Sequence, residues 1–360
     1  MDIAKTAVLY TIGKPLVIKN IIIPPLKSGA VLCRIKITTI CGSDIHTVKG
    51  LRNEPLPLIL GHEAVGEIVD IKASPDTKGL KKGDIVTWAI AVSCGKCFFC
   101  RKKLPQKCVS LYKYGHSSVK KWPFLTGGLS EYIYLLPGSA IYKIPQEISQ
   151  KEILATANCT LATAVNAIEN ISFKKGETAL VQGAGLLGLY ITSLLRVKGA
   201  SVIIVTDVNP DRLKLAGEFG ADYTFNIQET GSSQNLQKTA RETTGGYGID
   251  NAFEACGNPE SIKDGIESLR IGGKYLIAGM VTANSEIVLS GNNIIRKCLT
   301  LKGIHNYRPD HLEKGIDFMK KYINKFPFQK IIGASYSLGD VNEAFKEASS
   351  GKYIRVGIKP

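Results

Sequence analysis

Four cysteines within fifteen residues, Cys94, Cys97, Cys100 and Cys108, restrict what this sequence can fold into more than any other feature. The spacing C-x2-C-x2-C-x7-C brings four sulfur ligands together in one short lobe. Four thiolates in a tetrahedral arrangement suit Zn(II), and because they fill every coordination position, such a site is structural. The spacing therefore predicts a short segment folded around a structural zinc ion.

Three other uses of clustered cysteines agree less well with the sequence. Disulfides are disfavoured because the nine cysteines are an odd number and the N-terminus has no apolar leader, which favours a reducing, cytoplasmic location. In an iron–sulfur pattern the fourth cysteine follows after three residues and precedes proline, whereas Cys108 follows after seven and precedes Val109. A nucleic-acid-binding zinc ribbon has two C-x2-C pairs split by a longer span.

The composition adds limits of its own. The 360 residues are 44% hydrophobic and 21% charged, which is typical of a globular chain with room for two domains. The net charge of +15 makes a basic zinc protein that binds nucleic acid an alternative. The lysines occur as scattered doublets, however, with no basic stripe, so we expect solvated surface charge and no nucleic-acid partner. No apolar run approaches about 18 residues, so no membrane contact is expected.

The spacing of apolar residues changes near residue 150. Before it, short strands and turns predict a β-rich segment with few helices. After it, helices alternate with buried strands, beginning with a helix at 153–170, a strand at 178–182 and a helix at 186–198. This alternation is typical of an α/β fold with a doubly wound parallel sheet, the Rossmann fold. The last residues, 306–360, are mixed and end in a strand.

A glycine motif joins that strand and helix. The sequence Gly183-Ala184-Gly185-Leu186-Leu187-Gly188 is G-x-G-x-x-G, directly after a predicted strand and at the start of a predicted helix. In this context the glycines allow a tight turn, close approach of a pyrophosphate and close packing of helix on strand. The phosphates then meet the positive end of the helix. The motif therefore predicts a dinucleotide site that includes the backbone of Leu186 and Leu187.

Asp207 ends the next predicted strand, 24 residues after Gly183. A carboxylate there accepts hydrogen bonds from the ribose hydroxyls and repels a 2′-phosphate, which favours NAD over NADP. Arg212, five residues further on, suits the pyrophosphate or the ribose edge better than a 2′-phosphate. The alternative is that Asp207 only caps the helix that follows it.

Three further residues form a second candidate metal site. Cys41 opens Cys-Gly-Ser-Asp, His62 lies in Gly-His-Glu, and Cys159 lies just before the nucleotide-binding segment. Each is ordinary alone, since a free cysteine is most often buried filler and a single histidine is usually no ligand. Two thiolates and an imidazole with an open fourth position make a catalytic zinc site, and Cys159 would place that metal near the nicotinamide.

These pieces together resemble the zinc-dependent medium-chain alcohol dehydrogenases over essentially the whole chain. The matching pieces, in the family's order and separations, are Cys41 to Asp44, Gly61 to Glu63, the cysteine lobe, Cys159, the glycine motif, Asp207 and Arg355. The resemblance implies a GroES-like catalytic domain in 1–157, with the zinc lobe at 94–108. It also implies a Rossmann NAD-binding domain in 158–303 and a return to the catalytic domain in 304–360.

The resemblance implies two zinc ions per chain and NAD as cofactors, with the catalytic zinc on Cys41, His62 and Cys159. Bound zinc lowers the pKa of an alcohol, whose hydride then passes to the nicotinamide and leaves an aldehyde or ketone. A zinc-free quinone reductase of the same superfamily is an alternative, but such proteins lack both metal sets.

Five more residues take roles from the resemblance. Asp44 is expected to orient His62, and Ser43 and His46 are expected to relay the proton to solvent. Glu63 is expected near the metal, and Arg355 is expected to bind the pyrophosphate of NAD.

The substrate is less determined by the sequence. Residues 157–159 and 303–307 are similar to a subgroup of these dehydrogenases associated with phosphonate catabolism. We expect either a broad range of simple alcohols or a polar or anionic alcohol of phosphonate or polyol type, with Arg308 or a nearby lysine holding the anion. The expected assembly is a homodimer or homotetramer, with strand pairing near 287–289 as the dimer contact.

Overall fold

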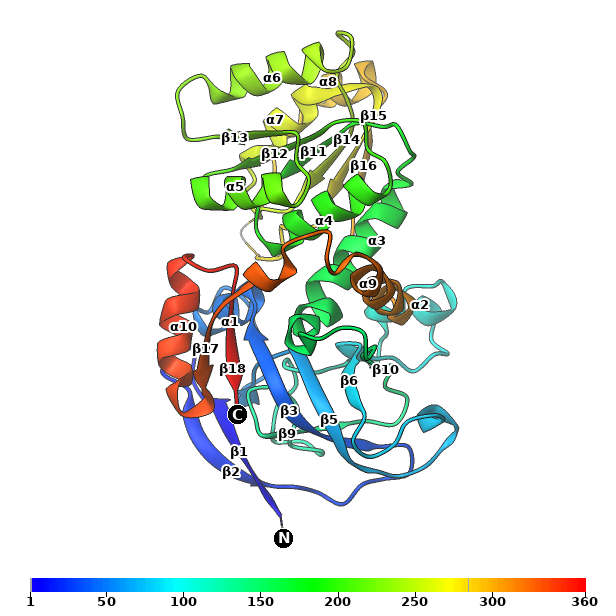
Figure 1. The fold of residues 1–360 in the computed structure, drawn as a ribbon, viewed down its shortest axis with the longest axis vertical. Helices are drawn as coiled ribbons and strands as arrows, with labels where there is room; N and C mark the ends of the chain where they lie inside the picture. The colour runs from blue at the N-terminus through cyan, green and yellow to red at the C-terminus, as the bar shows by residue number, and fades with distance from the viewer. Residues whose placement is uncertain (1, 284) are drawn as a thin grey trace. The chain divides into compact units, whose positions relative to one another are not determined.

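The computed structural model describes residues 2–283 and 285–360, which form two compact units (Figure 1). Unit 1 takes in the chain up to Ala162, together with Tyr307–Ile323 and Phe328–Pro360. Unit 2 takes in Thr163–Asn306 and Asn324–Pro327. Unit 1 is therefore made of both ends of the chain, and unit 2 of its middle.

The largest sheet of unit 1 is a mostly antiparallel sheet. Its strands are β3 (Val31–Ile40), β5 (Glu63–Ile71), β6 (Ile85–Trp88), β9 (Tyr132–Leu135), β10 (Ile141–Lys143), β17 (Ile332–Ser337) and β18 (Arg355–Lys359). Their order is β10-β6-β5-β3-β18-β17, and β9 also pairs with β3. The C-terminal strand β18 thus lies beside β3, about three hundred residues away in sequence.

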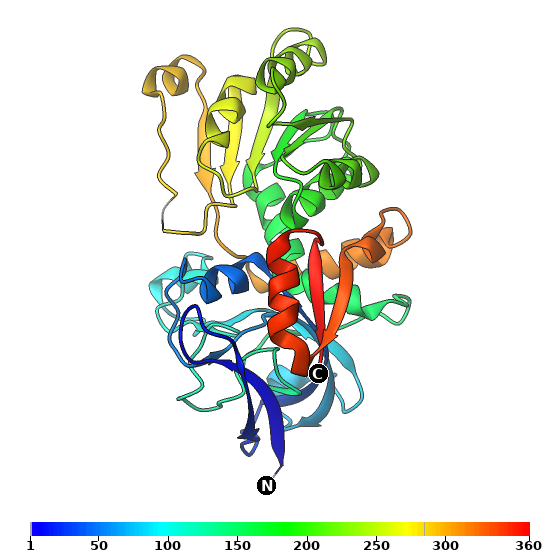
Figure 2. The ribbon, with the colours of Figure 1, turned by 90° about the vertical axis from the view of Figure 1, so that its left-hand side faces the viewer.

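Smaller elements complete unit 1. A second sheet has the order β2-β1-β4, and β7 pairs with β8. These strands are β1 (Ile3–Leu9), β2 (Val17–Ile22), β4 (Leu58–Ile59), β7 (Ala91–Val92) and β8 (Tyr112–Lys113). The helices are α1 (Gly42–Val48), α2 (Phe98–Arg101), α9 (Pro309–Tyr322) and α10 (Val341–Ser350). Figure 2 shows α10 alongside β17 and β18, where Val341 and Phe345 join Val356 and Ile358 in one buried apolar cluster.

Unit 2 is a six-stranded parallel sheet of order β13-β12-β11-β14-β15-β16. The strands are β11 (Ala179–Gln182), β12 (Ile203–Asp207), β13 (Tyr223–Asn226), β14 (Ile249–Glu254), β15 (Leu269–Ile277) and β16 (Thr300–Gly303). The helices are α3 (Ala162–Ile171), α4 (Leu186–Val197), α5 (Pro210–Glu218), α6 (Ser232–Glu242), α7 (Ser261–Ser268) and α8 (Gly291–Arg296). Every residue of β11 and β12 is buried, as expected when helices cover both faces of a parallel sheet. This order is the Rossmann order, so the predicted fold class is confirmed.

Two local predictions differ from the structure. The helix expected at 153–170 is a 3-10 helix over Lys151–Thr156, a π-helical turn over Ala157–Leu161, and only then α3. The wider π turn changes which way its side chains project, and such turns often occur at functional sites. The segment near 287–289 is not a strand in the single chain, where β16 ends the order of the sheet.

Gly127 allows a close backbone approach that can be tested. A Cβ atom there would lie 2.1 Å from the Ile59 carbonyl oxygen and 2.5 Å from that of Leu60, so backbone would have to move. We expect Gly127→Ala to lower the free energy of unfolding by at least about 2 kcal/mol, measured by denaturant titration. Gly217→Ala is the matched control, because no atom lies within 4 Å of its added Cβ in α5. We expect Gly217→Ala to be as stable as the unsubstituted protein or slightly more stable. Equal losses of stability in the two variants would contradict the close backbone approach at Gly127.

Candidate functional site

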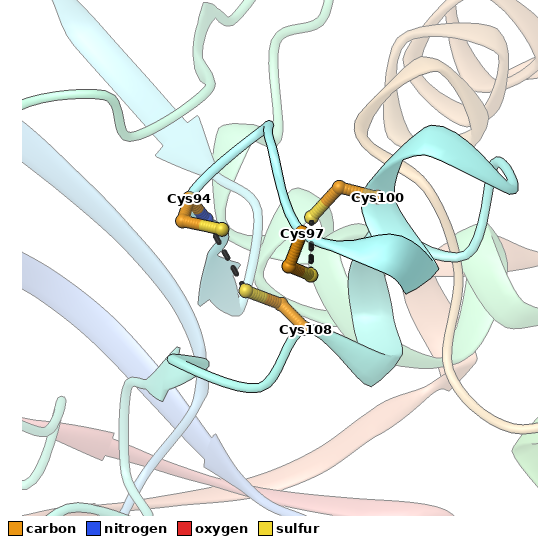
Figure 3. Close-up of side chains that lie close together, drawn as sticks. All are labelled: Cys94, Cys97, Cys100 and Cys108. Atoms are coloured by element: carbon orange, nitrogen blue, oxygen red, sulfur yellow. Dashed lines mark hydrogen bonds between the residues drawn. The ribbon is translucent and has the colours of Figure 1, made fainter.

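The cysteine lobe brings its four sulfur atoms together, as Figure 3 shows. The ligand atoms of Cys94, Cys97, Cys100 and Cys108 all lie within 4.8 Å of one another. The Sγ atoms of Cys97 and Cys100 are 3.5 Å apart. Tetrahedral zinc with Zn–S bonds of about 2.3 Å separates its sulfurs by about 3.8 Å, so this arrangement fits the ion.

The backbone of the lobe favours thiolates. The N–H groups of Cys94 and Ser110 point at the Cys108 Sγ, at 3.3 Å and 3.4 Å. Hydrogen bonds from the backbone N–H groups of Cys100 and Val109 lower the pKa of the Cys97 thiol to about 6. Because Phe98 and Phe99 of α2 are largely exposed, the lobe has little apolar core of its own. A bound metal would therefore supply much of its order.

A second cluster forms where three strands of the large sheet meet. In the antiparallel pairing of β3 with β5, Thr39 lies opposite Glu63, which brings Cys41 beside His62. The pairing of β18 with β3 brings Arg355 to the same edge. Cys159 joins them from the π turn, and the ligand atoms of Cys41, His62, Glu63 and Cys159 all lie within 4.8 Å of one another. Cys41, His62 and Glu63 are buried, and Cys159 is partly exposed.

Asp44 organises the first two ligands. One carboxylate oxygen accepts a hydrogen bond from the Cys41 backbone N–H at 2.9 Å, and the other accepts from the Gly61 N–H at 3.3 Å. The latter oxygen is also 3.3 Å from His62 Nδ1, a contact too poorly aligned to be a hydrogen bond. Burial lowers the pKa of His62, but the Asp44 and Cys41 charges outweigh it and raise the pKa to about 10. His62 Nε2, 3.3 Å from Ser43 Oγ, remains the nitrogen turned toward the cluster.

The two cysteines of the cluster share a hydrogen bond. It lowers the pKa of Cys41 well below the usual value and raises that of Cys159 well above it. The Arg355 guanidinium also favours the Cys41 thiolate, and its Nη2 is 3.4 Å from Sγ. A thiolate beside an imidazole in a buried setting is the donor set that zinc prefers, so these residues fit the predicted ion.

Glu63 and Arg355 form a buried ion pair beside this cluster. Arg355 donates through Nε to one Glu63 oxygen at 2.7 Å and through Nη2 to the other at 2.9 Å. Thr39 and Thr160 each donate a hydroxyl hydrogen bond to Glu63, at 2.6 Å and 2.9 Å. Burial raises the pKa of Glu63, and the Arg355 charge opposes this effect. The predicted role of Arg355 at a pyrophosphate stays a prediction.

His46 lies on α1, three residues after Ser43, and is partly exposed. Its Nδ1 atom is buried and has no hydrogen-bond partner among the described residues. Burial and then the Arg52 charge lower its pKa, so the imidazole is neutral near pH 7. A neutral imidazole with a free nitrogen can accept a proton.

The glycine motif of unit 2 has the geometry that the sequence predicted. It joins β11 to α4, with Gly185 as the N-cap residue of the helix. A Cβ on Gly188 would lie 1.8 Å from the Gly183 carbonyl oxygen, and Gly183 has a φ of +105°. Only glycine fits both positions without backbone movement. The first helical residues, Leu186 and Leu187, follow at the helix N-terminus, where an anion is favoured.

Asp207 lies at the end of β12, next to this loop. Its oxygens accept hydrogen bonds from the backbone N–H groups of Ala184, Val208 and Asn209, at 2.7, 2.8 and 2.9 Å. Asp207 is not the cap of the next helix, because Asn209 fills that role by accepting from the Asp211 and Arg212 N–H groups. The carboxylate is thus held firmly in position at the turn.

Sequence reasoning missed a polar group that follows the cysteine lobe. The His116 ring centroid is 4.9 Å from that of His62, and its Nδ1 is 3.0 Å from Glu54. Glu54 is also 3.0 Å from Arg52. No motif marks these residues, and the only local signal is that Lys113 and His116 directly follow the predicted zinc lobe.

Comparison with known proteins agrees with this geometry. Residues 27–146 match the family described as alcohol dehydrogenase GroES-like domain, and residues 187–321 match zinc-binding dehydrogenase. A probable D-xylulose reductase A of Aspergillus fumigatus is 30% identical over 347 residues, covering 93% of this chain and 91% of that protein. A crystal structure of an alcohol dehydrogenase from Thermotoga maritima superposes with a TM-score of 0.94 and 32% identity, covering all of both chains.

A putative zinc-binding dehydrogenase from Sinorhizobium meliloti, bound to NADP, has the same fold, with a TM-score of 0.89 and 22% identity over the whole of both chains. Fold and site thus define an oxidoreductase with two clusters of side chains that could hold a metal ion. The chain belongs to the zinc-dependent medium-chain dehydrogenase/reductase family, whose members act on small-molecule alcohols. Among the described residues, no helix is long and apolar enough to cross a bilayer.

The buried Glu63–Arg355 pair leads to a stability prediction. Either Glu63→Gln or Arg355→Met leaves the opposite charge buried and unpaired, so we expect a loss of about 3–5 kcal/mol in the free energy of unfolding. Denaturant titration of both variants and of the double variant measures the coupling. The exposed pair Glu343–Lys346 is the control, and Glu343→Gln should change little. Losses that simply add in the double variant would contradict a direct interaction.

The two metal clusters lead to a second prediction. Cys97→Ser should lose about one zinc ion per chain and lower the melting temperature, since the lobe depends on the metal for its order. Cys159→Ser should lose the other ion and the activity. Metal analysis of each purified variant measures this, with Cys298→Ser, an exposed cysteine outside both clusters, as the control. Full metal content in Cys97→Ser would show that the lobe does not bind zinc.

Proposed function

We propose that this protein is an NAD-dependent alcohol dehydrogenase whose catalytic zinc is held by Cys41, His62 and Cys159. The observation that carries the proposal is the convergence of these three ligand atoms in one buried cluster. A soft, three-ligand set leaves a fourth position for the substrate oxygen, as catalytic zinc sites require. Glu63 is the fourth residue of this cluster. Its carboxylate forms an ion pair with Arg355.

Zinc bound there would supply Lewis acidity that favours loss of the alcohol proton near neutral pH. NAD bound to unit 2 would supply the acceptor for the hydride of the alcohol carbon, and the proton of the alcohol would leave for solvent. Ser43 is proposed to accept the proton first, because its hydroxyl is 3.3 Å from His62 Nε2 at the cluster. His46 is proposed to take it next, since its neutral ring has a free Nδ1 and is partly exposed.

Unit 2 is proposed to bind NAD through the glycine motif and Asp207. The N–H groups at the start of α4 would bind the pyrophosphate, and Arg212 is proposed to add positive charge to it. Three backbone N–H groups hold the Asp207 carboxylate at the end of β12, where it can accept from the ribose hydroxyls. A fixed carboxylate supports NAD over NADP because it would repel a 2′-phosphate.

Three further proposals complete the assignment. A second, structural zinc ion binds the four cysteines of the lobe, whose sulfur spacing supports it. The protein works as a homodimer or homotetramer, which is supported by the strong exposure of Val288 and Ile295 in unit 2. We place it in the cytoplasm because a reducing compartment keeps the cysteines of the two clusters as thiols that a metal can bind.

A screen of alcohols with NAD and NADP, followed by the absorbance of the reduced nicotinamide, tests the function directly. The zinc content of the same sample is measured alongside. Turnover with about two zinc ions per chain is the expected result. A fully metal-loaded protein that oxidises no alcohol and reduces no aldehyde or ketone would overturn the proposal.

Asp207 gives a prediction on cofactor choice. Asp207→Asn keeps one acceptor oxygen, enough for Val208 and Asn209 but not also for Ala184, and removes the charge that would repel a 2′-phosphate. We expect kcat/KM with NAD to fall by roughly 10- to 100-fold, and the NADP/NAD ratio to rise. Asp211→Asn is the control, because that exposed carboxylate lies on the first turn of α5. An unchanged ratio in Asp207→Asn would contradict the assignment.

A further inference from the structure

Glu254 is the last residue of β14, and its side chain is fully buried in unit 2. One of its carboxylate oxygens accepts a hydrogen bond from the Gly257 backbone N–H, and the other accepts from the Gly279 N–H at 2.9 Å. In the described part of the chain, no cation pairs with this carboxylate. Burial of a charge costs free energy unless hydrogen bonds replace its water, so the two N–H groups stabilise Glu254 in this position.

The two N–H groups belong to two different loops. Gly257 lies in the loop that follows β14, and Gly279 lies in the loop that follows β15. The Glu254 backbone carbonyl also accepts from the Ala278 and Gly279 N–H groups, at 3.0 Å and 3.2 Å. A Cβ on Gly279 would lie 2.6 Å from a Glu254 carboxylate oxygen and 2.7 Å from the Gly257 nitrogen. The carboxylate therefore joins two loops whose backbones are already in close contact.

The loop after β14 also contacts the first glycine of the nucleotide motif. A Cβ on Gly183 would lie 2.9 Å from the backbone nitrogen, the Cα and the Cβ of Cys256. The Ala255 N–H donates to the Gln182 carbonyl at 2.9 Å, which fixes this loop to the end of β11. Gly183 in turn presents the carbonyl that Gly188 approaches. A displacement of Cys256 would therefore displace the glycine turn as well.

These loops lie at the edge of the parallel sheet where a ligand is expected. The chain leaves β11 to form β12 on one side, and it later returns to form β14 on the other side of β11. In open parallel sheets, ligands bind outside the carboxyl ends of the strands at such a reversal of strand order. Asp207 lies on the β12 side of this point, and the two loops that Glu254 joins lie on the β14 side.

We propose that Glu254 is a positioning residue for the dinucleotide. Its carboxylate holds the loops at 255–257 and 278–280 and, through Cys256, the turn at Gly183. Because its side chain is fully buried and both oxygens are occupied, Glu254 acts through the backbone and not by contact with NAD. A backbone that is already in place binds a ligand with less loss of conformational entropy. This inference rests on the proposed NAD-dependent function and adds a residue to it.

Asp250, near the other end of β14, provides a matched comparison. Its carboxylate accepts hydrogen bonds from the Thr178 backbone N–H at 2.7 Å and from the Thr178 hydroxyl at 2.8 Å. It also accepts from Arg270 Nε at 2.6 Å. Asp250 thus joins the segment before β11 to β15, at the edge of the sheet opposite to the glycine motif. Loss of either carboxylate should destabilise unit 2, but only loss of Glu254 should change the dinucleotide site.

The test measures dinucleotide binding in the full-length, zinc-loaded protein, by titration with NADH followed by its fluorescence. Glu254→Gln keeps the size of the side chain but has one acceptor oxygen, so one loop N–H would face an amide NH2 group. We expect the Kd for NADH and the KM for NAD to rise roughly tenfold, since one charge-assisted hydrogen bond that holds the site is lost. At saturating NAD, kcat should change much less.

Two further variants separate positioning of the site from general stability. Asp250→Asn is expected to lower the free energy of unfolding, measured by denaturant titration, and to leave the Kd for NADH unchanged. Glu254→Asp keeps the charge but is one methylene shorter, so it can hold one loop and not both. It is expected to raise the Kd for NADH in the same direction as Glu254→Gln, by a smaller factor.

Three results would overturn the inference. An unchanged Kd for NADH in Glu254→Gln, or an equal rise in Asp250→Asn, would reduce Glu254 to a residue that only stabilises the fold. Failure of both Glu254 variants to fold, while Asp250→Asn folds, would lead to the same conclusion. Each of these results leaves the dehydrogenase intact. An unsubstituted protein that binds neither NADH nor NADPH would instead overturn the proposed function itself.

Discussion

The ion pair between Glu63 and Arg355 is the interaction on which the arrangement of the metal cluster depends. It joins the start of β5 to the start of β18, and hydroxyls from β3 and the π turn, on Thr39 and Thr160, close around it. Because an unpaired charge at this depth is costly, each of these segments is held in the position that satisfies the pair. The same positions bring Cys41, His62 and Cys159 together. The interaction that holds the segments is therefore also the one that assembles the site.

The two units illustrate two ways of building a site from backbone geometry. In unit 2, the site is local: the glycine motif, one strand end and one helix start lie within a single strand–helix connection, and Asp207 is held by three neighbouring N–H groups. In unit 1, the site is assembled from distant segments by antiparallel pairing of β3 with β5 and β18. A local site depends on a few residues of sequence, whereas an assembled one depends on the whole sheet.

This difference explains which features could be predicted from the sequence. The parallel sheet, the glycine motif and the cysteine lobe were predictable, because each rests on spacings of a few residues that physical chemistry restricts tightly. The π turn at 157–161 was not, because its pattern of apolar residues is the same as that of the helix expected there. Asp207 was predicted as a carboxylate at a strand end, but only the structure showed that Asn209, not Asp207, caps the helix.

The sequence by itself determined the cysteine lobe, the nucleotide motif and the fold class, since these follow from short-range pattern. Cys41, His62 and Cys159 lie far apart in the chain, and only the resemblance grouped them. The tertiary structure decided which cations are balanced. Arg308 is the anion-binding candidate named from the sequence, but in the folded chain its guanidinium donates two hydrogen bonds to the Asp310 carboxylate. Ion pairing depends on distances of a few ångströms between side chains, and no spacing along the chain determines those distances before the chain has folded.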